Sequence, residues 1–217
     1  MLRGRQIVLL VHPLIRAVPW SPVAAATGLA AAAMLPALLG AAAPAAQVWG
    51  LRIAAVLMGA GASFAMVDAM APLTVGPTPR WLRQWLRFAV ALIPAAAVWG
   101  GLFLLAAAAL PDDVPALPAG DLAAEAAVCS FSGLAGAAAA ARTGHTMTVA
   151  LAGPATQCAL LVATLFLPGR SSPWPLPQAA SWADVHRCWW AAIPILVAAL
   201  LVANRDGWPL LRRKAGT

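Results

Sequence analysis

Six segments of about 20 mostly apolar residues constrain the fold of this chain more than any other feature. They cover residues 22–43, 51–72, 88–110, 122–141, 146–167 and 188–203. A helix needs about 20 apolar residues to cross a bilayer, because it rises about 1.5 Å per residue and the hydrocarbon core is about 30 Å thick. No segment has the alternating pattern of a strand. We therefore expect a single all-α integral membrane domain with six transmembrane helices.

Composition agrees with this interpretation. The 217 residues are 62% hydrophobic and 10% charged, whereas a soluble domain has about 25% charged residues. These values exclude a soluble enzyme, a disordered protein, a disulfide scaffold and a nucleic-acid-binding role for the net charge of +7. Alanine makes up about a quarter of the chain, and alanine-rich helices need close packing on other helices. The abundance of Ala, Gly, Pro and Arg indicates a GC-rich bacterial source, and hence a bacterial plasma membrane.

The distribution of basic residues predicts the orientation. Lys and Arg are enriched on the cytoplasmic side of membrane proteins. If the N-terminus is cytoplasmic, 11 of the 14 basic residues lie inside and three lie outside. The three outer ones are Arg52, Arg170 and Arg187. We therefore expect both termini to be cytoplasmic.

Residues 1–20 precede the first predicted span and combine arginines, an apolar run and Trp20. This composition is typical of a helix that lies in the membrane interface. The alternative is a loose tail that only contributes positive charge.

Residues 79–87, between the second and third spans, predict a short cytoplasmic amphipathic helix. Pro79 suits the start of a helix. Three basic residues would share one face and two tryptophans the adjacent face; they are Arg80, Arg83 and Arg87, and Trp81 and Trp85. This pattern suits a docking element for a cytoplasmic partner, and it equally suits a basic, aromatic anchor at the interface.

Two further features are candidates for function. Asp68 lies near the inner end of the second predicted span, where an ionisable residue is costly and is a functional candidate by default. The alternative is a simple pairing or capping role.

The outer connection 168–187 is rich in proline and tryptophan. Prolines prevent a long helix and tryptophans favour the headgroup region, so this segment is either a lid or an anchored loop folded against the outer face.

Motifs for catalysis are weak. Ser132-Gly133 in the fourth span and His186 near the sixth superficially resemble the serine–histidine pair of rhomboid-type intramembrane proteases. However, Ser130 stands where that family has glycine, and His186 lies in a Trp/Arg-rich boundary. The chain has no phosphate-binding loop, and Cys129, Cys158 and Cys188 match no metal or redox spacing. We therefore expect no enzyme activity and no cofactor in this chain.

The layout resembles the membrane (permease) subunits of ABC exporters of the drug- and polysaccharide-export type. Residues 2–16 would match their interfacial elbow helix, 80–87 their coupling helix, and 168–187 their outer element. The pattern Trp182-x-x-x-His186-Arg187-x-Trp189, followed by Asn204-Arg205-Asp206, is similar to small actinobacterial proteins of this kind.

This resemblance implies a transmembrane subunit that exports an amphipathic or hydrophobic compound. A separate ABC ATPase subunit would bind ATP and Mg²⁺ and would dock on residues 80–87. A second permease subunit, identical or different, would complete the pathway, and ATP binding would switch it by rigid-body motion. The alternative is a non-catalytic accessory or assembly subunit of a membrane complex; an intramembrane enzyme using Ser132 and His186 is a further alternative.

Overall fold

The computed structural model describes residues 12–39, 43–67, 80–142, 146–167 and 172–205, and all regular structure in these ranges is helical. Six long helices are present: α2 (Trp20–Leu38), α3 (Pro44–Ser63), α5 (Arg80–Ala108), α6 (Ala119–Ala140), α7 (Thr146–Leu165) and α8 (Trp182–Asn204). The short helix η1 (Phe64–Met66) follows α3 directly. Each long helix is long and apolar enough to cross a membrane. The expected all-α fold with six candidate spans is confirmed.

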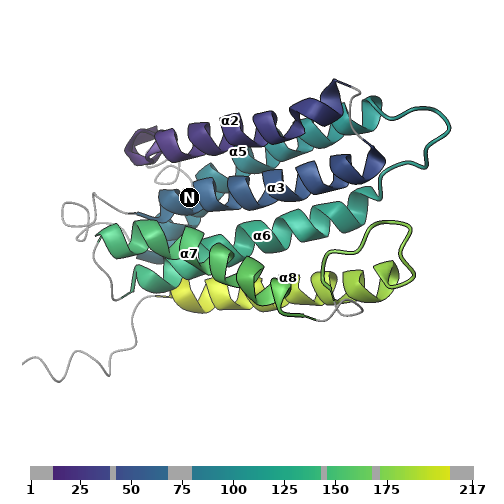
Figure 1. Ribbon diagram of the computed structural model, residues 1–217. Coiled ribbons are helices and arrows are strands. Elements are labelled where there is room, and N and C mark those ends of the chain that lie inside the picture. Colours follow the sequence, from purple (N-terminus) through teal and green to yellow (C-terminus); the bar gives the residue numbers. More distant parts are fainter. Residues whose placement is uncertain (1–11, 40–42, 68–79, 143–145, 168–171, 206–217) are drawn as a thin grey trace, which may run out of the picture.

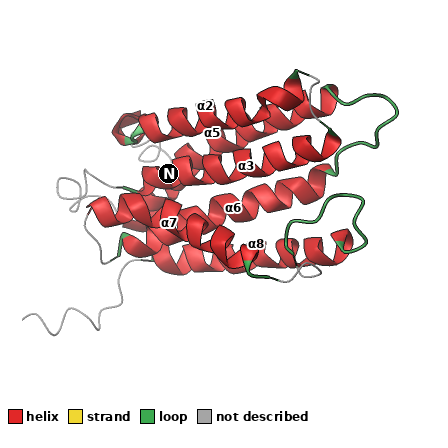
Figure 2. Ribbon diagram, in the orientation of Figure 1, coloured by secondary structure: helices red, strands yellow, loops and turns green. Residues whose placement is uncertain are grey.

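Successive helices run in opposite directions, so the bundle has two distinct ends (Figures 1 and 2). One end is formed where α2, α5 and α7 finish and where α3, α6 and α8 begin. We call it the acidic end, because every acidic residue in the described ranges lies there: Asp112, Asp113, Asp121, Glu125 and Asp184. We call the opposite end the basic end, because it carries Arg16, Arg80, Arg83, Arg87, Arg142 and Arg205.

Helices α3 and α6 form the centre of the bundle. In each of them 67% of the apolar window is buried, compared with 17–28% in the other four helices. Helix α2 packs on α3, whereas α7 and α8 pack on α6. The four outer helices consequently present apolar side chains to the surroundings, including Leu29, Ile93, Leu151 and Ile195, as expected of surfaces in contact with lipid or another subunit.

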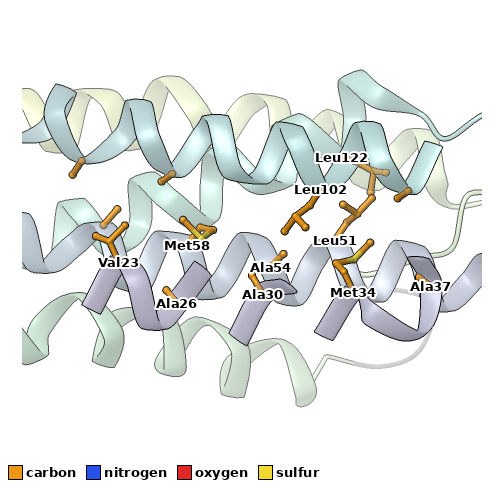
Figure 3. Packing of buried hydrophobic residues seen from close by; sticks show 14 of the residues in the cluster. Val23, Ala26, Ala30, Met34, Ala37, Leu51, Ala54, Met58, Leu102 and Leu122 are labelled. Carbon is orange, nitrogen blue, oxygen red and sulfur yellow. The ribbon is translucent and has the colours of Figure 1, made fainter. Parts of the chain in front are cut away.

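The interface between α2 and α3 shows how the alanine content is used (Figure 3). The buried residues of α2 recur at intervals of three or four and therefore share one face; they are Val23, Ala26, Ala30, Met34 and Ala37. They pack against Leu51, Ala54 and Met58 of α3. Because most of these side chains are small, the two backbones approach closely.

Glycines bring α3, α6 and α7 even closer together. A Cβ atom on Gly59 would lie 2.9 Å from the Cys129 carbonyl oxygen, and one on Gly133 would lie 3.2 Å from the Gly59 carbonyl oxygen. Gly136 faces Thr156 of α7 at similarly short range. Gly133 and Gly136 therefore allow α6 to approach α3 and α7 closely.

Several helix boundaries differ from those predicted. Helix α3 begins at Pro44, seven residues earlier than expected, because proline is well suited to the first turn of a helix. Helix α8 begins at Trp182 rather than at residue 188. The short helix expected at 79–87 is continuous with the third span, so α5 extends for 29 residues from Arg80. Pro36, Pro94, Pro154 and Pro194 lie inside helices, as is tolerated in membrane bundles.

Part of the predicted N-terminal interfacial segment falls in the described ranges. Residues 12–17 are helical, and Leu14 and Val18 are buried against the bundle. The indole Nε1 of Trp20 donates to the Ile15 carbonyl oxygen over 2.8 Å. These contacts attach residues 12–20 to α2, so this part is not a loose tail.

Candidate functional site: a buried ion network at the acidic end

Three ionisable side chains from three different helices meet inside the acidic end. Arg52 of α3, Glu125 of α6 and His186 of α8 have exposed fractions of 3%, 1% and 2%. Glu125 lies six residues into its helix, about 9 Å along the axis at about 1.5 Å per residue. Charges at such depth are costly and are retained only with partners, so this network is the strongest candidate site among the described residues.

Arg52 and Glu125 form a bidentate ion pair. The Arg52 Nε atom donates to Glu125 Oε2 over 2.7 Å, and Nη2 donates to Oε1 over 2.7 Å. Two parallel charge-assisted hydrogen bonds fix both the distance and the orientation of the two groups. The pair therefore connects the two central helices, α3 and α6, in a defined geometry.

Arg52 also holds the connection between α7 and α8. Its Nη1 atom donates to the Trp174 carbonyl oxygen over 3.2 Å, and its Nη2 atom donates to the Pro175 carbonyl oxygen over 2.6 Å. Proline-rich backbone lacks several N–H groups, and its carbonyl groups are available to an outside donor. The segment 172–181 is thus folded back onto the bundle, as expected for part of the predicted outer element.

His186 completes the network from α8. Its Nε2 atom lies 3.0 Å from Glu125 Oε1, and its Nδ1 atom lies 2.8 Å from the Trp182 carbonyl oxygen. The imidazole also stacks on the Trp182 indole, with ring centroids 3.9 Å apart. Both ring nitrogens are consequently engaged, and the ring cannot rotate without breaking two polar contacts.

Tryptophan side chains enclose the network. Three indole rings lie 5.1–6.0 Å from the Arg52 guanidinium carbon, within range of cation–π attraction; they belong to Trp49, Trp174 and Trp182. Trp174 packs on Trp189 with centroids 4.9 Å apart. Because the three ionisable side chains are almost fully buried, their charges are balanced mainly by one another.

The indole N–H groups around the network have partners of their own. Trp182 and Trp190 donate to the carboxylate of Asp121 over 2.6 Å and 3.3 Å. Trp189 donates to the Pro173 carbonyl oxygen over 3.0 Å, and Trp174 donates to Thr164 Oγ1 over 3.1 Å. These hydrogen bonds orient the aromatic rings, as is usual for buried tryptophan.

An apolar groove of about 360 Å³ opens beside the network, between α3 and α7. It is lined mainly by hydrophobic side chains, with Arg52 at one end. Because the guanidinium of Arg52 is already bonded to Glu125 and to segment 172–181, the groove offers an apolar surface and not a free cation.

The serine–histidine alternative is not supported by the contacts of these two residues. Ser132 Oγ donates to the Cys129 carbonyl oxygen over 2.9 Å within its own helix. His186 is directed at Glu125 and the Trp182 carbonyl group. In this arrangement, Ser132 and His186 are not hydrogen-bonded to each other, and no group of three His, Cys, Asp or Glu residues in the described ranges could hold a metal.

The predicted docking residues lie at the basic end, and their environments differ. Arg83 and Arg87 are buried, with 6% and 0% exposed, and Arg87 Nη1 donates to the carbonyl oxygens of Ala65 and Val67 over 3.2 Å and 2.5 Å. Arg87 therefore stabilises the end of η1, where carbonyl groups lack helical partners.

The two tryptophans of the same segment also differ in how far they are exposed. Trp85 packs edge-on against Phe88 with centroids 5.2 Å apart, and Trp81 is 46% exposed. The side chain of Arg80 and the whole of Asp68 lie outside the described residues. Of the five docking candidates, Trp81 is the one with a described, exposed side chain.

The sequence alone does not predict the contact between Arg52 and Glu125. Its pattern places Arg52 in an outer connection and offers only Ser132 as a partner for His186. One signal was available: Glu125 is the sole glutamate of the chain and stands inside an apolar segment. In a bundle of alternating helices, the starts of the second, fourth and sixth spans share one end, and these starts carry the three residues.

Comparisons with protein-family models, with curated proteins and with solved structures find no match to this chain. The function is therefore inferred from the arrangement of the helices and from the chemistry of the buried network.

Proposed function

We propose that this protein is the transmembrane subunit of an ATP-driven transporter of the ABC class, and that a separate subunit hydrolyses ATP. The arrangement of the six candidate spans carries this proposal. A short helix at residues 12–17 precedes the first span, and the third span is extended at the same end by the basic turns of α5. A segment folded onto the opposite end lies between the last two spans. This order of elements resembles the permease subunits of drug and polysaccharide exporters.

The membrane orientation forms part of the proposal. The basic end would face the cytoplasm, in agreement with the positive-inside rule, so both termini and the start of α5 would be cytoplasmic. The partner ATPase would supply the ATP and Mg²⁺ sites, since the sole lysine of the chain, Lys214, does not lie in a phosphate-binding loop.

The transported compound would be amphipathic or hydrophobic. A groove of about 370 Å³ between α3, α5 and α6 is lined mainly by alanine and other apolar side chains, with Ser130 as its polar member. It opens on the side of the bundle. A pathway formed with a second subunit, rather than within one chain, would fit this position.

Purification in mild detergent from the native host tests the proposal. We expect an ATPase to copurify with the tagged wild-type chain. Trp81→Ala, at the basic end, should weaken this association, because an exposed tryptophan at an interface contributes on the order of 2 kcal/mol, or about thirtyfold in affinity. Trp190→Ala is the matched control, since Trp190 is 50% exposed but belongs to the acidic end.

The outcomes separate the candidate functions. Failure of any ATPase to copurify with the wild-type chain would contradict a transporter subunit. Recovery of a stable complex of other membrane proteins without an ATPase would instead support the accessory role. Equal effects of Trp81→Ala and Trp190→Ala would contradict docking at the start of α5.

A further inference from the structure

The hydrogen-bond partners of His186 determine which of its nitrogens carry hydrogen. Its Nδ1 atom lies 2.8 Å from the Trp182 carbonyl oxygen. A backbone carbonyl group can only accept, so this contact is a hydrogen bond only if Nδ1 carries a hydrogen atom. In a neutral imidazole, the second nitrogen, Nε2, then has a lone pair and no hydrogen.

The contact between Nε2 and Glu125 therefore requires an additional proton. Nε2 lies 3.0 Å from Glu125 Oε1. If Glu125 is ionised, both atoms bear lone pairs, and a neutral His186 would place them in repulsion in a dry environment. A hydrogen bond forms in two cases: the imidazole is doubly protonated, or the Glu125 carboxyl group is protonated and donates to Nε2. Each case adds one proton to the pair.

The surrounding charges do not replace this proton. Arg52 donates to both oxygens of Glu125, but it has no acceptor atom and cannot supply a hydrogen bond to a lone pair on both Nε2 and Oε1 at their mutual contact. On α6, Asp121 accepts from Trp182 and Trp190, and Cys129 lies one turn deeper. On α8, Asp184 and Arg187 form an exposed pair of their own. Segment 172–181 contains no titratable side chain.

We propose that Glu125 and His186 form a binding site for one proton, which is shared between Glu125 Oε1 and His186 Nε2. With the proton bound, the Arg52–Glu125–His186 network has a net charge of +1 wherever the proton resides. Release transfers the proton to water at the acidic end and leaves an ionised Glu125, still paired with Arg52, beside a neutral His186. A neutral His186 has a single N–H group, so it can keep only one of its two hydrogen bonds, to Glu125 or to the Trp182 carbonyl group.

Proton release also requires movement of the residues that cover the site. Trp182 stacks on the imidazole, and Glu125 and His186 are both almost fully buried. The proton can therefore leave only when the residues that cover these two side chains move. The inference rests on contacts at the acidic end, and it is independent of whether an ATPase binds at the basic end.

The composition of the chain allows a direct test without any change in the site. Glu125 is the only glutamate, and the chain has three histidines: His12, His145 and His186. We would incorporate glutamate labelled with ¹³C at its side-chain carboxyl group and ¹⁵N-histidine into the full chain in lipid bilayers, and record solid-state NMR spectra. The variant His12→Gln/His145→Gln leaves His186 as the single histidine signal.

At neutral pH we expect one added proton in the pair. The spectra should show either a doubly protonated His186 with an ionised Glu125, or a neutral His186 with a protonated Glu125. An ionised Glu125 beside a neutral His186 at neutral pH would overturn the proposal.

Exchange with deuterated water provides a second readout. In the wild-type chain, the ring N–H groups of His186 should exchange about tenfold more slowly than those of the exposed His12, or slower still. The reason is that the buried His186 exchanges only when the covering residues open. Exchange of His186 as fast as that of His12 would show that the site is open to water and would contradict a proton enclosed by Trp182 and segment 172–181.

Discussion

Among the described charged side chains of the acidic end, Arg52 has the most hydrogen-bond partners. It bonds to both oxygens of Glu125 and to two carbonyl groups of segment 172–181. One guanidinium thus connects α3, α6 and the chain that leads into α8. The planar fork of arginine can serve all of these acceptors, whereas the single ammonium of lysine could not reproduce the bidentate geometry.

Arg52→Ala is expected to destabilise the protein by about 3–5 kcal/mol, because it leaves the carboxylate of Glu125 buried without its counter-ion. The change is measured as the loss of helical signal during thermal or detergent-induced unfolding. Arg187→Ala is the control: Arg187 and Asp184 are 80% and 74% exposed, and exposed pairs contribute about 0–1 kcal/mol.

The double variant Arg52→Met/Glu125→Leu distinguishes a charge effect from a packing effect. Apolar side chains of similar size can replace a buried ion pair at little cost, so the double variant should be more stable than Arg52→Ala. A double variant that is as unstable as Arg52→Ala would indicate that the carbonyl groups of Trp174 and Pro175, rather than the ion pair, depend most on Arg52.

At the scale of the helices, contact between α3 and α6 depends on the absence of side chains at Gly59 and Gly133. Gly59→Ala should cost about 1–3 kcal/mol, since a Cβ atom would lie 2.9 Å from the Cys129 carbonyl oxygen and 3.0 Å from the Ser130 Cα atom. Gly100→Ala in α5 is the matched control, because nothing lies within 4 Å of its Cβ position. Equal unfolding midpoints for the two variants would contradict the proposed close packing.

The helices themselves could be predicted from the sequence, because a continuous apolar segment has few alternatives to a membrane-spanning helix. Their starts could not. Arg52, Glu125 and His186 each lie within the first turns of a helix, and a polar residue at such a position cannot be distinguished from a loop residue by hydropathy alone. The polar groups that stabilise these residues belong to other helices and to segment 172–181.

The basic turns of α5 illustrate the same limit. The spacing of Arg83 and Arg87 places them on one helix face, and both side chains are buried. The pattern could not decide whether that face is turned toward a partner or toward the protein. In the structure it is turned inward, where Arg87 meets the carbonyl groups at the end of η1.

At the scale of the whole molecule, the two ends of the bundle carry charges of opposite sign in the described residues. The two described basic residues of the acidic end, Arg52 and Arg187, are each paired with a carboxylate there, Glu125 and Asp184. The described acidic residues are confined to this end, whereas the basic end carries six arginines. The excess of arginines at the basic end agrees with the prediction that the acidic end faces away from the cytoplasm.

Cysteine labelling in cells tests this orientation. Asp113→Cys and Arg205→Cys place thiols at exposed positions of the acidic and basic ends, in a background where the exposed Cys158 and Cys188 are changed to serine. Cys129 is retained because it is buried. A maleimide that cannot cross membranes should label Asp113→Cys in intact cells and should label Arg205→Cys only after permeabilisation, because the basic end is expected to be cytoplasmic. The reverse pattern would place the proton site at the cytoplasmic side and would contradict ATPase docking at Trp81, whereas labelling of both positions in intact cells would indicate that the chain inserts in two orientations.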